Sequence, residues 1–228
     1  MSGRVLILRP EPGASATAAR ARALGLEPIV APLFDVRAVP WEAPEPGRHD
    51  AMLFTSAHAP RLAGEPLGAL TQLPAYAVGE ATAAAARAAG FAYVRTGASD
   101  AAALADLAAA DGVSRALHLC GREHLPFDRP GLAVEARVVY AADPREGPVE
   151  VPTGAIILLH SPRAAALLAA RVADRSAVQL ACISAAAAEA AGDGWAAKAV
   201  AGAPRDEALL EVARGLCQKG GDAAAAGD

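Results

Sequence analysis

Short apolar segments alternate with alanine-rich stretches along the whole chain. The apolar segments end at polar, glycine or proline positions, which is typical of buried strands. They predict strands over 5–8, 27–31, 51–55, 75–78, 92–95, 116–120, 136–141, 155–160, 179–183 and 198–201. Helical spacing predicts helices over 14–24, 82–89, 100–110, 164–173 and 206–217, with Asp100 and Asp206 as helix starts. The alternation indicates βαβ units, parallel sheets and the α/β class.

The pattern also repeats itself. Residues 51–56 (Ala-Met-Leu-Phe-Thr-Ser) align with 156–161 (Ile-Ile-Leu-Leu-His-Ser) at an offset of 105 residues. At the same offset, Val78-Gly79 aligns with Ile183-Ser184. Each match lies at the carboxyl end of a predicted strand, the edge at which open parallel sheets bind ligands. We therefore expect two similar α/β lobes whose ligand-binding edges face a shared cleft.

The strand count predicts a discontinuous domain. The second copy has only three strands after residue 155, and the first two strands of the chain otherwise have no sheet to join. Placing these together yields five strands in each lobe and makes the chain cross between lobes twice. Pro/Gly-rich segments at 40–47 and 144–154 suit those crossings. The predicted domains are 1–37 plus 144–219, and 38–143 inserted between them, with 220–228 as a disordered tail.

Composition narrows the function classes. A formal charge of −4 and 4% aromatic residues argue against a nucleic-acid partner. No stretch approaches the ~20 apolar residues of a membrane span, and the first apolar run is too short for a signal peptide. The three cysteines have no metal-type spacing and are expected to be reduced thiols. These features predict a cytoplasmic protein without a membrane partner.

The common cofactor motifs are missing. No Gly-x-Gly-x-x-Gly follows a strand, and the chain has no Walker loop. The five histidines show no zinc-type spacing with cysteine or acidic residues. We therefore expect no cofactor and no metal site.

The remaining candidates lie in loops at strand ends. Helix amino termini there offer backbone N–H groups to anions, and arginine suits carboxylates. Any one of these residues can equally cap a helix or lie in solvent, but six such loops together predict a site for a large polyanion. The candidate binding residues are Arg9, Thr55, Ser56, Gly79, Thr82, Gly121, Arg122, Ser161 and Ser184.

Tyr140 is the candidate for chemistry. It lies near the end of a predicted strand and beside the second crossing. A tyrosine there either packs or, with an unperturbed pKa near ~10, donates a hydrogen bond or proton to a leaving hydroxyl.

Taken in order, these residues resemble the uroporphyrinogen-III synthase family. The resemblance runs from about residue 5 to about residue 215. It rests on Arg9-Pro10, Phe54-Thr55-Ser56, Ala77-Val78-Gly79-Glu80-Ala81-Thr82-Ala83, Cys120-Gly121-Arg122-Glu123, Val139-Tyr140 and His160-Ser161-Pro162-Arg163.

The resemblance implies two flavodoxin-like lobes with parallel five-stranded sheets, joined by a two-stranded connection. It also implies a cofactor-independent hydro-lyase that cyclises the linear tetrapyrrole hydroxymethylbilane, with loss of water and inversion of the terminal pyrrole ring. Tyr140 would assist departure of hydroxide, and Thr55, Ser56, Gly79, Thr82, Gly121, Ser161 and Ser184 would bind carboxylates, mainly through backbone N–H groups. We expect a monomer that makes at most transient contact with the preceding pathway enzyme.

The chain departs from the family at two loops. Relatives commonly have glycine and then threonines where this chain has Ser184-Ala185-Ala186-Ala187, and the asparagine often found after the Thr-Ser turn is absent, with His58 nearby. Two alternatives stay open. One is a non-catalytic two-lobed binding protein for an anionic metabolite. The other is a flavodoxin-like redox or phosphate-handling protein, which the missing nucleotide loops and scarce aromatic residues disfavour.

Overall fold

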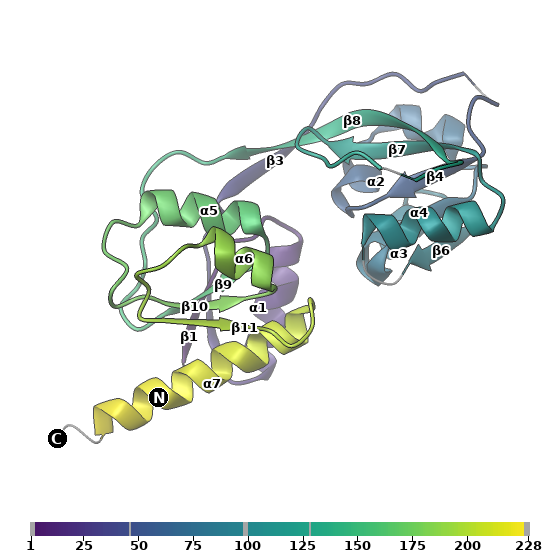
Figure 1. Ribbon diagram of the computed structural model, residues 1–228. Helices are drawn as coiled ribbons and strands as arrows, with labels where there is room; N and C mark the ends of the chain where they lie inside the picture. The colour runs from purple at the N-terminus through teal and green to yellow at the C-terminus, as the bar shows by residue number, and fades with distance from the viewer. Residues whose placement is uncertain (1–2, 46, 98–99, 128, 226–228) are drawn as a thin grey trace. The chain divides into compact units, whose positions relative to one another are not determined.

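The computed structural model describes residues 3–45, 47–97, 100–127 and 129–225, and its contacts define two compact units (Figure 1). Unit 1 comprises Met1–Asp35 and Pro144–Asp228, and unit 2 comprises Val36–Asp143. Unit 1 is thus built from both ends of the chain. No helix in the described part of the chain has the length and apolar character that a membrane crossing requires.

Unit 1 contains a five-stranded parallel sheet in the order β11-β10-β9-β1-β2. Its central strands are buried on both faces, which is why they are nearly continuous apolar runs in the sequence. In the central pair, Val5 lies beside Ile156 and Ile7 beside Leu158. The strands are β1 (Arg4–Ile7), β2 (Glu27–Val30), β9 (Ile156–Leu159), β10 (Gln179–Cys182) and β11 (Ala197–Val200).

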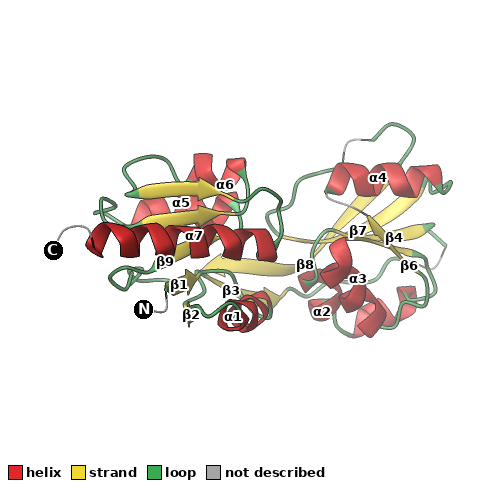
Figure 2. Ribbon diagram, turned by 90° about the horizontal axis from the view of Figure 1, so that it is seen from below, coloured by secondary structure: helices red, strands yellow, loops and turns green. Residues whose placement is uncertain are grey.

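Helices cover both faces of this sheet (Figure 2). Alternate strand residues such as Ile7 and Leu158 share one core cluster with residues of α1 (Gly13–Ala23) and α7 (Asp206–Ala225). The other face is packed by α5 (Pro162–Arg171) and α6 (Ala185–Ala190), which also contact each other. The small alanine side chains on these helices permit close packing against the strands.

Unit 2 contains a six-stranded sheet in the order β3-β8-β7-β4-β5-β6. All pairings from β8 to β6 are parallel. Backbone hydrogen bonds from Val39 N–H to the Val139 carbonyl and from Arg145 N–H to the Leu33 carbonyl show that β3 runs antiparallel to β8. The strands are β3 (Phe34–Ala38), β4 (Ala51–Phe54), β5 (Ala75–Val78), β6 (Val94–Gly97), β7 (Arg115–Gly121) and β8 (Ala133–Pro144).

Alternation along β4 and β7 distributes side chains between two cores in unit 2. Met52, Phe54 and Leu117 face α2 (His58–Leu62), the 3-10 helix η1 (Glu65–Leu70) and α3 (Gly79–Ala88). Leu53 and Ala116 face α4 (Ala101–Ala110) instead. The side chain of Asp100 caps α4 by accepting the Ala103 N–H at 2.8 Å.

These observations confirm the α/β class, the two lobes and the two-stranded connection, because the boundaries of the units fall within β3 and β8. Three details differ from the sequence-based expectation. The strand β3 was not expected, and it raises the second sheet to six strands. The helix η1 was also not expected. The loop at Gly121-Arg122-Glu123 was expected at a helix amino terminus, whereas among the described elements β7 is followed there by β8 and not by a helix.

The last helix is longer than its periodicity indicates. It was expected over 206–217, whereas α7 continues to Ala225. Alanine, the strongest helix former, occupies 223–225 and favours this continuation. The predicted tail, 220–228, therefore overlaps the helix, and residues 226–228 lie outside the described part of the chain.

Candidate functional site

The candidate residues of unit 1 lie at the carboxyl ends of its parallel strands. Arg9 follows β1, Ser161 follows β9 and Ser184 follows β10. Ser161 is the N-cap of α5 and accepts the Ala164 N–H at 3.2 Å, and Ser184 is the N-cap of α6 and accepts the Ala187 N–H at 3.3 Å. Both hydroxyl oxygens therefore already satisfy a helix donor.

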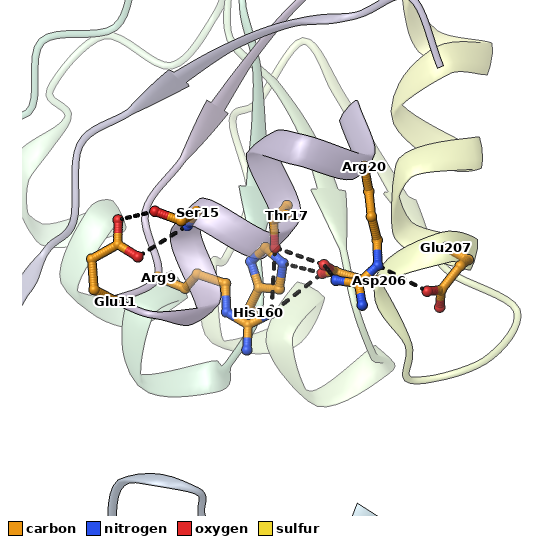
Figure 3. A network of polar contacts seen from close by, with 8 residues as sticks. All are labelled: Arg9, Glu11, Ser15, Thr17, Arg20, His160, Asp206 and Glu207. Atoms are coloured by element: carbon orange, nitrogen blue, oxygen red, sulfur yellow. Dashed lines mark hydrogen bonds and ion pairs between the residues drawn. The ribbon is translucent and has the colours of Figure 1, made fainter. Parts of the chain in front are cut away.

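Arg9 takes part in a network centred on Asp206, the first residue of α7 (Figure 3). The Asp206 carboxylate accepts hydrogen bonds from four side chains and is 8% exposed. The donors and their distances are Thr17 Oγ1 at 2.7 Å, His160 Nε2 at 2.8 Å, Arg20 Nη1 at 3.0 Å and Arg9 Nη1 at 3.3 Å. This carboxylate ties β1, α1, β9 and α7 together.

The network shifts two pKa values. Burial alone would raise the pKa of Asp206, but hydrogen bonds from His160 and Thr17, together with the Arg9 charge, lower it to about 2. Burial lowers the pKa of His160, and Asp206 only partly opposes this effect. His160 is therefore neutral at neutral pH. Because a carboxylate only accepts hydrogen bonds, the His160 proton is on Nε2.

Carboxylates of the protein itself thus already bind the polar groups of the loop after β1. Besides Asp206, Glu11 accepts the Ser15 N–H at 3.0 Å and the Ser15 hydroxyl at 2.8 Å, so a carboxylate occupies the amino end of α1. Arg9 lies against Gly13, where a Cβ would be 2.5 Å from Arg9 Nε. Since 35% of the Arg9 side chain stays exposed, it can still meet an anion while held by Asp206.

In unit 2, the loop after β4 holds Thr55 and Ser56. The Thr55 hydroxyl lies 3.0 Å from Nε2 of His118, a buried β7 residue. Ser56 Oγ accepts the His58 N–H at 3.3 Å. Both side chains are partly exposed. Thr55 thus has a buried partner on one side and access to solvent on the other.

Gly79 and Thr82 belong to α3, which follows β5 directly. Gly79 is the first residue of the helix and has a φ of 71°, a conformation that favours glycine. Its N-cap, Val78, makes no side-chain capping hydrogen bond, so the first N–H groups of α3 are not satisfied by a cap as those of α5 and α6 are. Thr82 is 5% exposed, and its side chain faces the core. What α3 can offer a ligand is its backbone.

Tyr140 lies in β8 beside the end of β7. A β-bulge at Cys120/Gly121 brings Gly121 opposite Tyr140, and the Arg122 N–H donates to the Tyr140 carbonyl at 3.0 Å. The Tyr140 ring is 5.5 Å from the His58 ring, measured between centroids. Tyr140, Gly121 and the loop after β4 therefore lie together at the carboxyl edge of this sheet.

Arg122 is less available than its position in the sequence indicates. Its Nη1 donates to Asp143 at 2.8 Å, and Arg37 Nε donates to the same carboxylate at 2.7 Å. The hydrogen bond from Arg37 is the main cause that lowers the pKa of Asp143. The Arg122 side chain is nevertheless 48% exposed, so it remains accessible to a ligand.

The described residues contain no group of three or more His, Cys, Asp or Glu side chains placed to hold a metal ion. A surface cavity of about 520 Å³ lies at the amino-terminal edge of the unit 2 sheet, lined by Arg48, His49, Arg115 and Glu135 among others. Glu135 pairs there with His49 at 3.1 Å and Arg48 at 3.7 Å. The cavity is at the strand edge remote from Thr55 and Gly79.

Comparison with known proteins gives these edges a context. A family model described as uroporphyrinogen-III synthase HemD matches residues 15–211, most of the chain. The chain belongs to the uroporphyrinogen-III synthase family. No curated protein matches the sequence significantly.

Two solved structures of this family resemble the chain. The uroporphyrinogen-III synthetase of Helicobacter pylori matches with 19% identity and a TM-score of 0.66, covering 95% of this chain and 100% of its own. A mutant uroporphyrinogen III synthase of the extremely thermophilic bacterium Thermus thermophilus matches with 17% identity and a TM-score of 0.51, covering 96% of this chain and 100% of its own. These structural similarities support the two-lobed α/β fold described above.

Sequence reasoning missed several residues that shape these synthase loops. It named Thr55 but not its partner His118, and Arg9 and Arg122 but not the carboxylates Asp206 and Asp143 that hold them. It treated Asp206 only as a helix start. A signal existed for His118 and His160, since a histidine within an apolar strand needs a polar partner. Which partner it finds depends on the tertiary structure.

Proposed function

We propose that this protein cyclises hydroxymethylbilane to uroporphyrinogen III, with loss of water and inversion of the terminal pyrrole ring. The observation that carries the proposal is the family match over residues 15–211. It is supported by the position of the candidate residues, which lie at the carboxyl edges of two doubly wound sheets. The activity is that of a hydro-lyase.

The substrate carries eight carboxylates, so binding requires many dispersed donors. Several groups are suited to this task. They are the open amino end of α3 at Gly79, the partly exposed hydroxyls of Thr55 and Ser56, and the exposed parts of the Arg9 and Arg122 side chains. At Ser161 and Ser184 the hydroxyl oxygens cap helices, so a carboxylate there would be bound mainly by backbone N–H groups. Thr82 and Gly121 would contribute through their backbone.

The chemistry itself asks little of acid–base groups. Tyr140 donates a proton to the departing hydroxyl, the C–O bond breaks, and water leaves behind a cation stabilised by the electron-rich pyrrole. The substituted carbon of the terminal ring then attacks this cation, forming a spiro intermediate that fragments and recloses with that ring inverted. The ring carbon that recloses loses its proton, which balances the proton given by Tyr140. Without the enzyme, the chain ends join directly. Positioning of the two ends is therefore the main contribution of the protein.

The remaining expectations form part of the same proposal. The domains are 1–37 plus 144–219, and 38–143, and the division of contacts at 35/36 and 143/144 supports these boundaries. The protein acts in the cytoplasm as a monomer, without a cofactor, and meets the preceding pathway enzyme only transiently.

The test is an isomer assay. Freshly generated hydroxymethylbilane is supplied to the purified protein, and the uroporphyrinogen isomers are oxidised and separated. Formation of isomer III faster than the spontaneous appearance of isomer I supports the proposal. Isomer I alone, at the spontaneous rate, contradicts it and leaves a binding protein for an anionic metabolite.

A further inference from the structure

Thr55 and His118 form a hydrogen bond, and which of the two donates it decides whether Thr55 can bind an anionic ligand. The two polar atoms, Thr55 Oγ1 and His118 Nε2, lie 3.0 Å apart. A threonine hydroxyl can donate one hydrogen bond and accept two, whereas an ionised carboxylate only accepts. Thr55 can bind a carboxylate through its hydroxyl only if the hydroxyl hydrogen is not already used by His118.

The strand register explains why these side chains meet. Leu53 of β4 lies beside His118 of β7, and Thr55 follows two residues after Leu53, so all three lie on one face of the sheet. This is the face that packs against α4. Phe127 packs edge-on against the His118 ring, with centroids 4.8 Å apart. His118 is 2% exposed, while Thr55 is partly exposed at the strand end.

His118 is held in its neutral form. Burial lowers its pKa to about 4, and the neighbouring His124 acts in the same direction. A neutral imidazole carries one N–H, either on Nδ1 or on Nε2. Nδ1 of His118 is buried and has no hydrogen-bond partner among the described residues.

The two tautomers have different consequences. With the proton on Nδ1, His118 would bury an unpaired N–H donor, and Nε2 would accept the only hydrogen of the Thr55 hydroxyl. With the proton on Nε2, His118 donates to Thr55, every N–H of the ring is paired, and only a lone pair on Nδ1 is left without a partner. Orphaned buried N–H groups are rare in folded proteins, so the second arrangement is favoured.

We propose that His118 is a positioning residue for Thr55: it donates its Nε2–H to the Thr55 hydroxyl, which then points its own hydrogen outward to a carboxylate of the substrate. This inference rests on the proposed function, because it assigns Thr55 a ligand of that class. His118 does not touch the substrate. It makes the threonine hydroxyl a donor toward the ligand.

The first test is spectroscopic and independent of catalysis. Long-range ¹H–¹⁵N correlation spectra of ¹⁵N-histidine-labelled protein report which ring nitrogen is protonated, and the His118 signals are identified by their loss in His118→Gln. Protonated Nε2 at pH 7 supports the proposal. Protonated Nδ1 overturns it, whatever the activity of the enzyme.

The second test compares variants. In His118→Gln the amide nitrogen can reach the position of Nε2 and donate to Thr55, whereas His118→Leu cannot donate. We expect about a tenfold rise in KM for hydroxymethylbilane with His118→Leu and with Thr55→Val, near wild-type KM with His118→Gln, and smaller changes in kcat. Urea unfolding of each variant confirms that the assayed protein is folded.

The two failures are distinguishable. If Thr55→Val raises KM and a folded His118→Leu does not, the positioning role is overturned while the proposed function stands. If both variants and His118→Gln raise KM equally, the donor role is likewise overturned, because the side chain then matters for shape alone. If the wild-type protein yields only isomer I, the proposed function fails, and the role of His118 in it falls too.

Discussion

The ring of Tyr140 lies directly against Gly121, where a Cβ atom would be 2.7 Å from Tyr140 Cζ and 3.0 Å from its hydroxyl oxygen. Such distances are too short for an added methyl group, so glycine at 121 is required for the observed position of the tyrosine. The backbone of Gly121 has no positive φ that would itself forbid alanine. The space above Gly121 is therefore occupied by the Tyr140 ring, which carries the candidate reactive hydroxyl. A substitution at Gly121 can displace this ring.

We predict that Gly121→Ala displaces the Tyr140 ring and lowers kcat at least tenfold, with a loss of stability of roughly 1–3 kcal/mol from overpacking. The matched control is Gly68→Ala in the same unit, where an added Cβ meets nothing within 4 Å. Steady-state assays and urea unfolding of both variants provide the test. Equal kcat in the two variants would mean that the position of the tyrosine is unimportant.

Tyr140→Phe removes the phenolic oxygen and keeps the ring. Because a proton donor acts at the chemical step, we expect kcat to fall about 100-fold, while affinity for the product, uroporphyrinogen III, changes less than threefold. Single-turnover kinetics and product titration measure the two quantities separately. Parallel losses in both would assign Tyr140 to binding and remove it from the chemistry.

Ser161 is predicted to act through its cap. Ser161→Ala leaves the Ala164 N–H without its acceptor and should cost about 1 kcal/mol of stability, whereas Ser161→Gly should cost only a few tenths of that amount. We expect both variants to keep a KM close to wild type, since the backbone N–H groups remain. A tenfold rise in KM would instead show that the hydroxyl itself binds substrate.

Asp206→Asn removes the charge at the centre of the unit 1 network, and we expect a loss of about 3 kcal/mol. In the wild-type protein the folded pKa of Asp206, about 2, is below its ordinary value of 3.8. Its stabilising effect is therefore present above pH 4 and lost as the pH falls toward 2, by roughly 2 kcal/mol. Urea unfolding at several pH values should show this step in the wild type and not in Asp206→Asn.

The neighbouring Glu207→Gln is the control for that experiment. Glu207 pairs only with Arg20 among the described residues, and its side chain is 60% exposed. Replacing it should change stability by less than about 1 kcal/mol and leave the acid step in place. A similar loss in both variants would mean that the burial of Asp206 adds nothing.

The buried His118 leads us to expect a second pH-dependent change in the free energy of unfolding. Its folded pKa, about 4, is depressed from 6.5, so the unfolded chain binds the proton more readily in between. Stability from this group is complete above pH 6.5 and declines as the pH falls toward 4, by roughly 3 kcal/mol. His118→Gln, which does not titrate, should flatten the decline relative to wild type. An unchanged slope would show that His118 is not held neutral by the fold.

Local pattern predicted the buried strands well because parallel strands covered on both faces are nearly continuous apolar runs. Phe34-Asp35-Val36-Arg37-Ala38 escaped notice for the converse reason: it is an edge strand in which charged residues alternate with apolar ones. The candidate loops followed from strand ends alone. The partners of Arg9, Thr55 and Arg122 did not, since Asp206, His118 and Asp143 are distant in sequence and meet them only in the folded chain.

The pairing of β1 with β9 joins residues 5–7 to residues 156–158. During synthesis the ribosome therefore completes every strand of unit 2 before β9, the central neighbour of β1, has emerged. Until then β1 can pair with β2, but its other edge lacks the neighbouring strand that completes the sheet. A truncation that removes α7 would accordingly leave unit 2 complete. In unit 1, however, β1, α1 and Arg9 would lose the Asp206 carboxylate that holds them together.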